Sequence, residues 1–239
     1  MNIYRSWIVS SRYLSELPRN FNKLVSIIYW PFIDIAVVGL IALSYAAADQ
    51  KICVTFYGLM AGVALWQLVV RANYAVCLNL LKEIEERNVA NLFSTPLTIV
   101  EWTLSTIISS GIVTTIVGFY CIGIVYLLFG FNIFSLGLNL IPIFLFLIIF
   151  GISISLFTAS FLIRWGLRVQ VLVWTIAWLF APFSCAYQPI NVLPNYLQVV
   201  AKLFPTYYIF RNIRLIVCSG KASMELFIIS FILTIFTLF

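Results

Sequence analysis

Six apolar runs, separated by short polar segments, limit this chain to a narrow set of folds. Each run is long enough, or nearly so, to cross a hydrocarbon core as a helix, which takes about 20 apolar residues. The runs are Leu24–Ala47, Cys53–Val76, Thr103–Phe129, Leu140–Ile163, Val169–Tyr187 and Met224–Phe239. The last run is the shortest, so either it ends at the membrane interface or the sequence continues beyond Phe239. We therefore predict an all-α, polytopic membrane protein with six transmembrane helices in one domain, residues 1–239.

The composition excludes a water-soluble fold and several kinds of active site. Hydrophobic residues make up 63% of the chain and charged residues only 9%, whereas soluble domains carry about 25% charged residues. The chain has no histidine, which removes histidine metal sites, Ser-His-Asp triads and histidine proton relays. Its five cysteines stand mostly inside apolar runs without metal-type spacing, so we interpret them as small buried hydrophobes. We predict no metal site and no catalytic residue.

The basic residues indicate how the chain crosses the membrane. Most of them stand in three segments that alternate with nearly uncharged loops: the N-terminal arm and the loops after the second and fourth runs. They are Arg5, Arg12, Arg19, Lys23, Lys82, Arg87, Arg164 and Arg168. Because cytoplasmic loops carry the excess of lysine and arginine, we predict cytoplasmic N- and C-termini and no nucleic-acid partner. One loop disagrees, because Lys202, Arg211, Arg214 and Lys221 fall on the opposite side.

Residues 1–23 predict a helix that lies in the plane of the lipid headgroups. At about 100° per residue, one stripe is charged and the opposite side is apolar. The charged stripe holds Arg5, Arg12, Glu16 and Arg19, and the apolar side holds Ile3, Trp7, Leu14 and Leu17. Pro18 and Asn20 would then turn the chain into the first run. The alternative is an ordinary cytosolic amphipathic helix.

Residues 82–98 form the most densely charged segment of the chain. Lys82–Arg87 predicts a charged continuation of the second helix, and Asn88–Phe93 a short, mildly amphipathic helix. Ser94-Thr95-Pro96 predicts a break, because a residue before proline is pushed out of the α region. Such a protrusion could fit a groove on a soluble protein; the alternative is a solvated hairpin that only links two spans.

Three stretches carry a resemblance to a known family. The first is Glu86-Arg87-Asn88-Val89-Ala90-Asn91-Leu92-Phe93-Ser94-Thr95-Pro96-Leu97, followed by Glu101. The second comprises Ala181-Pro182-Phe183-Ser184, Tyr187-Gln188-Pro189, Leu193-Pro194, Leu197, Pro205-Thr206, Tyr208 and Arg214. The third and weaker stretch is Tyr29-Trp30-Pro31 with Asp34. Together they resemble the type-2 ABC exporter permeases, in which an acidic residue and Arg-Asn or Arg-Gly precede a leucine-rich turn ending in Ser/Thr-Pro-Leu.

The chain departs from that family at two places. Many members have glycine where Cys185 or Ala186 stands, and an acidic or neutral residue is common at the position of Arg211. These departures bear on the substrate path rather than on the fold.

The resemblance implies a machine in which two permease subunits sit above two cytosolic ATPase subunits. The sequence contains no GxxxxGK(S/T) phosphate loop, so ATP and Mg²⁺ would bind on the partner ATPase and this chain would hold no cofactor. Fold-level analogy implies that one cytoplasmic coupling helix docks on the ATPase and transmits its closure. The residues implied are Glu85, Glu86, Arg87, Asn88, Asn91, Leu92, Phe93, Thr95 and Pro96.

The family further implies an inner-membrane exporter. The second permease subunit would be an identical chain, with a heterodimer as the alternative, and membrane lipid would surround both. The cargo would be amphipathic, lipid-linked, drug-like or a polysaccharide, and would move outward.

The resemblance also implies an explanation for the basic loop that disagrees with the predicted topology. Residues 188–214 would form short helices that dip back into the membrane from outside, where such backbone must be buried in protein or line water. Arg211 and Arg214 would either touch phosphate headgroups or line the exit and meet an anionic substrate.

Asp34 lies inside the first run, where a carboxylate is costly unless it is paired, hydrated or protonated. A structural pair with Arg71 would meet this need; otherwise Asp34 marks the substrate path or the dimer seam. The predicted substrate path comprises Trp30, Asp34, Trp178, Phe183, Arg211 and Arg214, although the aromatic residues of the fifth run could serve packing alone. The rival function is an ion- or proton-coupled secondary transporter that uses Asp34. A membrane enzyme is disfavoured by the lack of histidine and of a clustered catalytic dyad.

Overall fold

The computed structural model describes residues 3–46, 53–219 and 223–238, and every regular element in these ranges is a helix. The order along the chain begins α1 (Ile3–Glu16), α2 (Phe21–Ala46), α3 (Cys53–Glu85), α4 (Val89–Ser94), α5 (Ile99–Phe129), η2 (Ile133–Asn139) and α6 (Leu140–Trp165). It continues η3 (Gly166–Val169), α7 (Val171–Ser184), η4 (Ile190–Val192), α8 (Asn195–Ala201), α9 (Pro205–Ser219) and α10 (Met224–Leu238). The predicted all-α class is confirmed for these residues.

Four helical stretches of the described chain are long and apolar enough to cross a membrane. They are Lys23–Ser44, Phe56–Glu85, Ile99–Phe129 and Ile133–Val169. The remaining two predicted spans correspond to the apolar helices α7 and α10, which have 14 and 15 residues. A 15-residue helix is about 22 Å long, whereas the hydrocarbon core is about 30 Å thick. The fifth and sixth spans therefore remain predictions.

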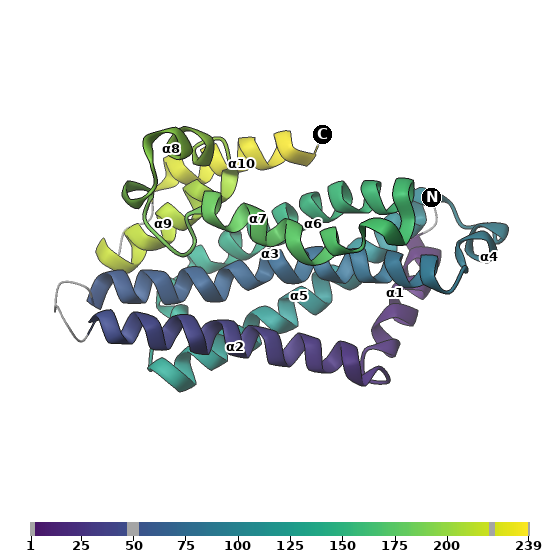
Figure 1. The fold of residues 1–239 in the computed structure, drawn as a ribbon, viewed down its shortest axis with the longest axis horizontal. Coiled ribbons are helices and arrows are strands. Elements are labelled where there is room, and N and C mark those ends of the chain that lie inside the picture. The colour runs from purple at the N-terminus through teal and green to yellow at the C-terminus, as the bar shows by residue number, and fades with distance from the viewer. Residues whose placement is uncertain (1–2, 47–52, 220–222, 239) are drawn as a thin grey trace.

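Helix α3 forms the centre of the bundle. Helices α2, α5, α6, α7 and α9 pack around it (Figure 1). In the most apolar window of α3, 89% of the residues are buried, against 17% in that of α2. Two glycines permit close approach of neighbouring segments: a Cβ on Gly62 would come within 2.2 Å of the Ala186 carbonyl oxygen, and one on Gly151 within 2.9 Å of the Val69 carbonyl oxygen.

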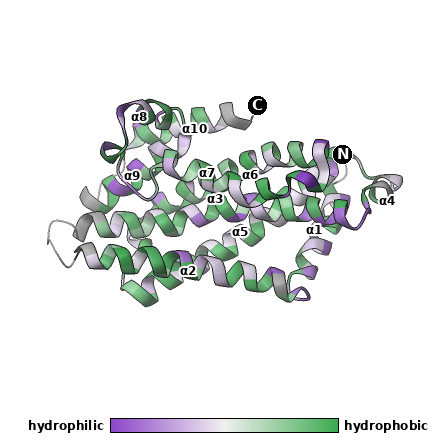
Figure 2. Cartoon of the chain, viewed as in Figure 1, coloured by the Kyte–Doolittle hydropathy of each residue, from purple (hydrophilic) through white to green (hydrophobic). Residues whose placement is uncertain are grey.

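Polar residues gather at the two ends of the bundle (Figure 2). We call one the α4 end, where α1 and the α3–α4 connection lie, and the other the α8 end, around α8 and α9. Between them the helices are mostly apolar. This distribution is that of a bundle whose middle lies in lipid.

Several helix boundaries differ from the sequence prediction for local reasons. Helix α1 ends at Glu16 and a turn over residues 17–19 leads to α2 at Phe21, so the predicted arm contains the turn. Helix α3 runs past the apolar run to Glu85, so the predicted charged continuation of this helix is present and ends two residues before Arg87. Helix α5 begins at Ile99 because Thr98 and Glu101 form a reciprocal capping box.

The chain after α7 is fragmented at its prolines. Pro189 and Pro194 precede η4 and α8 in extended conformations, and Pro205 is the first residue of α9. Proline suits a first helical position because its missing N–H would have no partner there. Whether these short helices re-enter a membrane remains a prediction.

Candidate functional site

The α3–α4–α5 connection has the arrangement that the sequence predicts. Helix α3 continues to Glu85, the chain turns through Arg87, and the short helix α4 follows. Thr95 then leaves helical geometry with φ −78° and ψ 160°, immediately before Pro96. Arg87 has a left-handed backbone with φ 53°, which is costly for a residue with a side chain. Figure 1 shows α4 at the extreme of the α4 end.

The predicted coupling residues divide into an outward group and an inward group. The side chains exposed at the α4 end belong to Glu85, Glu86, Arg87, Asn91, Thr95 and Pro96. Leu92 is buried in the core, and Asn88 is half-buried. The side chain of Phe93 lies outside the described residues.

A buried carboxylate, Glu83, organises the inward side of this connection. Its side chain is 1% exposed and accepts hydrogen bonds from Arg12 Nη2 at 2.6 Å and from Tyr13 Oη at 3.0 Å. Its second oxygen accepts from Asn88 Nδ2 at 2.6 Å. Trp102 Nε1 in turn donates to Tyr13 Oη at 3.0 Å. We call Arg12, Tyr13, Glu83, Asn88 and Trp102 the Glu83 cluster; it joins α1, α3, the start of α4 and α5.

Burial fixes the protonation of one member of this cluster. Desolvation raises the pKa of the Tyr13 phenol well above its usual value, and the neighbouring Glu83 carboxylate raises that pKa further. Tyr13 is therefore a neutral donor at physiological pH, as its hydrogen bond to a carboxylate requires.

Additional contacts tie α1 to the same end of the bundle. Arg5 Nη1 donates to the Pro96 carbonyl at 2.5 Å, and Ser10 Oγ to the Ser105 carbonyl at 2.7 Å. Glu16 forms ion pairs with Lys82 and with Lys23. The buried face of α1 is Ser6, Ser10 and Tyr13, while Ile3 and Trp7 remain exposed. Ile3 and Trp7 are thus uncovered in the described chain, while Leu14 and Leu17 of the same apolar side are half-buried; that this helix lies at the membrane interface stays a prediction.

The expected pair between Asp34 and Arg71 does not form. Asp34 Oδ2 accepts a hydrogen bond from Gln67 Nε2 at 2.9 Å instead. The Arg71 guanidinium donates to the Ser26 carbonyl at 3.0 Å and lies over the Tyr74 ring, with Cζ 5.4 Å from its centroid. The physical reason is that Arg71 extends towards the start of α2, while Gln67, one turn away on α3, faces Asp34.

Helix α7 extends this row of polar side chains, and we call Asp34, Gln67, Tyr74 and Trp178 the polar line. Trp178 Nε1 donates to Tyr74 Oη at 3.2 Å, and Tyr74 Oη donates to the Trp174 carbonyl at 3.2 Å. The Trp178 and Tyr187 rings lie 6.4 Å apart. Among the described residues, neither Gln67 Oε1 nor Tyr187 Oη, both buried, has a hydrogen-bond partner, which is costly unless something supplies one.

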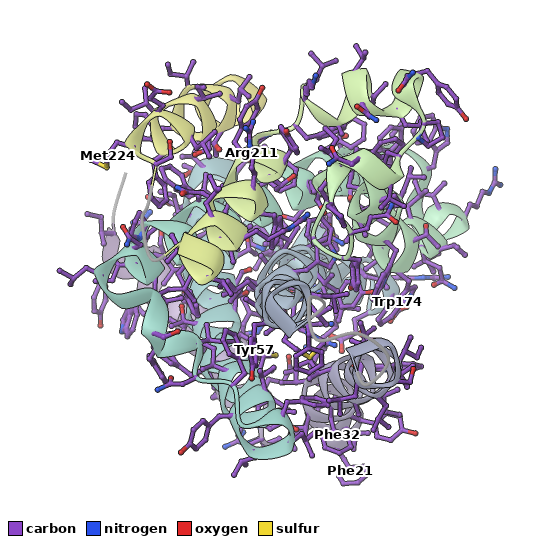
Figure 3. All side chains as sticks on the ribbon, turned by 90° about the vertical axis from the view of Figure 1, so that its left-hand side faces the viewer. Phe21, Phe32, Tyr57, Trp174, Arg211 and Met224 are labelled. Carbon is purple, nitrogen blue, oxygen red and sulfur yellow. The ribbon has the colours of Figure 1, made fainter. Side chains whose placement is uncertain are left out.

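The structure brings together only some of the predicted path residues. Two of them, Asp34 on α2 and Trp178 on α7, are the two ends of the polar line. Phe183 stacks against Phe204, with centroids 5.9 Å apart, and therefore serves packing within the described chain. Trp30 is 54% exposed on α2. Seen along the bundle, Phe32 of α2 and Trp174 of α7 lie on the same side of α3, where the bundle leaves its apolar side chains uncovered (Figure 3).

Arg211 and Arg214 meet at the α8 end. Together with Lys202 they line a hollow of about 1020 Å³, and no carboxylate of the described chain lines it. Its other walls include Cys185, Asn191, Gln198 and Tyr207. Arg211 lies on the side of α9 that faces away from α3 (Figure 3), and the stem of Arg214 packs over Gly58. The hollow therefore has the charge to attract an anion.

Sequence reasoning missed Glu83, Gln67 and Tyr74. Gln67, Arg71 and Tyr74 follow i, i+4, i+7 spacing on α3, so their shared face was readable as a polar stripe within an apolar run. Glu83 stands in a run of charges, and nothing in that run distinguishes it from its exposed neighbours.

Comparison with known proteins identifies the family. Residues 27–239 match the family described as ABC-2 family transporter protein. The match covers the candidate spans from residue 27 onward, the α4 connection and the segment after α7, and it confirms the resemblance stated above. No curated protein matches the sequence. The chain belongs to the ABC-2 family of transporter proteins and is a multi-pass membrane permease.

Proposed function

We propose that this permease is the transmembrane subunit of an ATP-driven exporter and receives its mechanical input through α4. The Glu83 cluster carries this proposal. It holds the start of α4 against α1, α3 and α5, so a force applied to α4 would move three helices together. An ABC-2 permease generally works with a cytosolic ATPase, and the chain carries no phosphate-loop motif.

The exposed side of the connection supports docking of a soluble partner. Glu85, Glu86, Arg87 and Asn91 project at the α4 end, where they can exchange charge-assisted hydrogen bonds with an ATPase groove. In this proposal the α4 end is cytoplasmic, both termini face the cytoplasm and the protein resides in an inner membrane. ATP and Mg²⁺ would bind on the ATPase.

The uncovered apolar face of α2 and α7 supports a seam with a second permease subunit. The large apolar side chains that these two helices leave exposed include Trp30, Phe32, Leu40, Trp174 and Leu179. We infer an identical second copy, because both halves of a symmetric seam would then use the same face. The polar line of Asp34, Gln67, Tyr74 and Trp178 borders this seam and would contact the polar part of an amphipathic cargo.

The basic hollow at the α8 end would receive the cargo as it leaves. The three cations among its lining residues favour a cargo with an anionic group, such as a lipid-linked phosphate or an acidic polysaccharide. Alternating exposure of the seam would follow closure of the ATPase dimer.

The rival proposal, a secondary transporter coupled through Asp34, also has an observation in its favour. Asp34 is half-buried, and its hydrogen-bond partner is the neutral amide of Gln67, so its carboxylate could take up a proton in the bilayer.

Co-purification and transport separate the two proposals. The chain is expressed with the ABC ATPase of its own organism, and the double variant E85K/E86K is compared with D34N. Under the exporter proposal, E85K/E86K loses the ATPase and transport while staying inserted, and D34N keeps the ATPase. Retention of the ATPase by E85K/E86K would remove α4 as the docking element. Transport by the purified permease alone would refute the exporter.

A further inference from the structure

We propose that the cavity between α1, α2, α3 and α5 binds the anionic headgroup of a membrane lipid, with Arg71 as its ligand. The cavity lies at the α4 end, apart from the basic hollow of α9, and it shares Tyr74 with the polar line beside the α2–α7 seam. This inference is independent of ATP-driven export, because it concerns a lipid held within one subunit.

Arg71 supplies the first reason. The residue is only 4% exposed, yet no carboxylate of the described chain lies within ion-pair distance, and its Nε has no hydrogen-bond partner. Its one described hydrogen bond goes to the Ser26 carbonyl. A buried guanidinium without a counter-ion is strongly unfavourable, and its planar donors match phosphate or carboxylate oxygens.

The cavity beside Arg71 supplies the second reason. Its cavity volume is about 50 Å³, which suits the anionic group of a headgroup and not a whole lipid. Its polar lining includes Lys23, Arg71, Tyr74, Asn79 and Ser109, which could bond to a headgroup. Its apolar lining comprises Leu14, Leu17, Ile27, Ala75, Leu78 and Val113. A space with cations at one point and aliphatic walls around it suits an anion that carries an apolar part, rather than a small soluble anion.

The position of the cavity supplies the third reason. Arg71 bonds to Ser26, which is one turn beyond Lys23, where the apolar part of α2 begins. The guanidinium therefore lies near the boundary between the polar end and the apolar middle, at the depth of a headgroup. Leu14, Leu17, Lys23 and Ile27 are half-buried at the corner where α1 turns into α2 (Figure 1), so a lipid could reach the cavity from the side.

The charges around the cavity leave Arg71 as the available cation. Lys23 Nζ is bonded to Glu16 Oε2 at 3.3 Å, and Glu16 is also paired with Lys82. In the described part of the chain, the one carboxylate that acts on Arg71 from the α2 side is Asp34, which lies beyond 4 Å and is already bonded to Gln67. A lipid phosphate would complete the coordination that these groups leave open.

Lipid binding to the purified, delipidated full chain tests the proposal. Native mass spectrometry in detergent measures retention of phosphatidylglycerol and of zwitterionic phosphatidylcholine, and soluble glycerol phosphate serves as competitor. We expect phosphatidylglycerol to bind in preference, and R71Q to weaken that binding at least tenfold. The control R168Q removes the same charge from an exposed residue and should bind as the wild type does.

A second variant covers the case in which R71Q fails to fold. A75F fills the cavity from α3 and keeps the guanidinium of Arg71, and it should also lose the preferential binding. Wild-type binding by folded R71Q, or by A75F, would overturn the proposal. Displacement by glycerol phosphate at the same concentration as phosphatidylglycerol would show a site for free phosphates, and would overturn it as well.

Discussion

The carboxylate of Glu83 meets the guanidinium of Arg12 at 2.6 Å, although the two residues stand 71 positions apart in the chain. Glu83 is buried, while the Arg12 side chain is 47% exposed. The pair therefore joins a solvent-facing helix to the interior of the bundle. Because Asn88 and Tyr13 bind the same carboxylate, the position of α4 depends on α1.

Removing the Glu83 carboxylate should destabilise the α4 end of the bundle. E83A leaves the buried donor of Tyr13 and the half-buried donor of Asn88 without their acceptor, and we expect a loss of about 3 kcal/mol in the free energy of unfolding. E83Q keeps the shape and should lose less, about 1–2 kcal/mol, because Arg12 is partly solvated. Thermal unfolding in detergent measures both. The exposed control E85Q should change stability by less than about 0.5 kcal/mol; an equal loss in E85Q would contradict the role of Glu83.

The Glu83 cluster also predicts that the stability of the folded protein depends on pH. The folded state raises the pKa of Tyr13 above the unfolded value, which is near 10. The folded state therefore holds this proton more tightly, and the stabilisation is fully present below pH 10 and declines as pH rises above it. We expect the difference in the free energy of unfolding between the wild type and Y13F to be constant from pH 7 to 9 and to become smaller above pH 10. A constant difference up to pH 11 would show that Tyr13 is not buried as described.

Two substitutions at Arg87 distinguish the effect of its charge from the effect of its backbone conformation. Its φ of 53° is strained for any residue with a Cβ, so R87G should stabilise the isolated permease by about 1 kcal/mol. R87A removes the same charge and keeps the strain, so its stability should match the wild type. If Arg87 also binds an ATPase through its guanidinium, both variants lose affinity equally. A destabilised R87G would contradict the left-handed turn.

The hydrogen bond between Gln67 and Asp34 should show as coupling in a double-mutant cycle. Q67L leaves Asp34 without its amide donor and should lower the unfolding free energy by about 1–3 kcal/mol. D34L should cost a similar amount, because it leaves the buried Gln67 amide unpaired. The double variant D34L/Q67L should cost less than the sum of the single variants. Strict additivity would mean that the two side chains do not interact.

The sequence was sufficient for the features that depend on local chemistry. The break at Thr95-Pro96, the helix over Val89–Ser94 and the apolar helices follow from proline geometry and from long apolar runs. It was insufficient where tertiary packing selects a partner. Lys82, Glu83, Glu85 and Glu86 form one charged run, and only the approach of α1 makes Glu83 the buried member. In the same way, whether Arg71 or Gln67 is the partner of Asp34 depends on which of the two α3 side chains extends to Asp34 on α2.

Close packing of α3 against the chain after α7 should be sensitive to a single methyl group. A Cβ at Gly62 would lie 2.2 Å from the Ala186 carbonyl oxygen, which belongs to the backbone and cannot rotate away. G62A should therefore cost about 1–3 kcal/mol, the usual range for overpacking. Gly111 of α5 is the matched control, because a Cβ there meets nothing within 4 Å. G111A should stabilise the protein by about 0.5–1 kcal/mol through helix propensity alone. Because Ala186 borders the segment that leads to Arg211 and Arg214, G62A should also lower transport more than G111A does. Equal stability of the two variants in a thermal unfolding assay would show that α3 and the Ala186 backbone are not in contact.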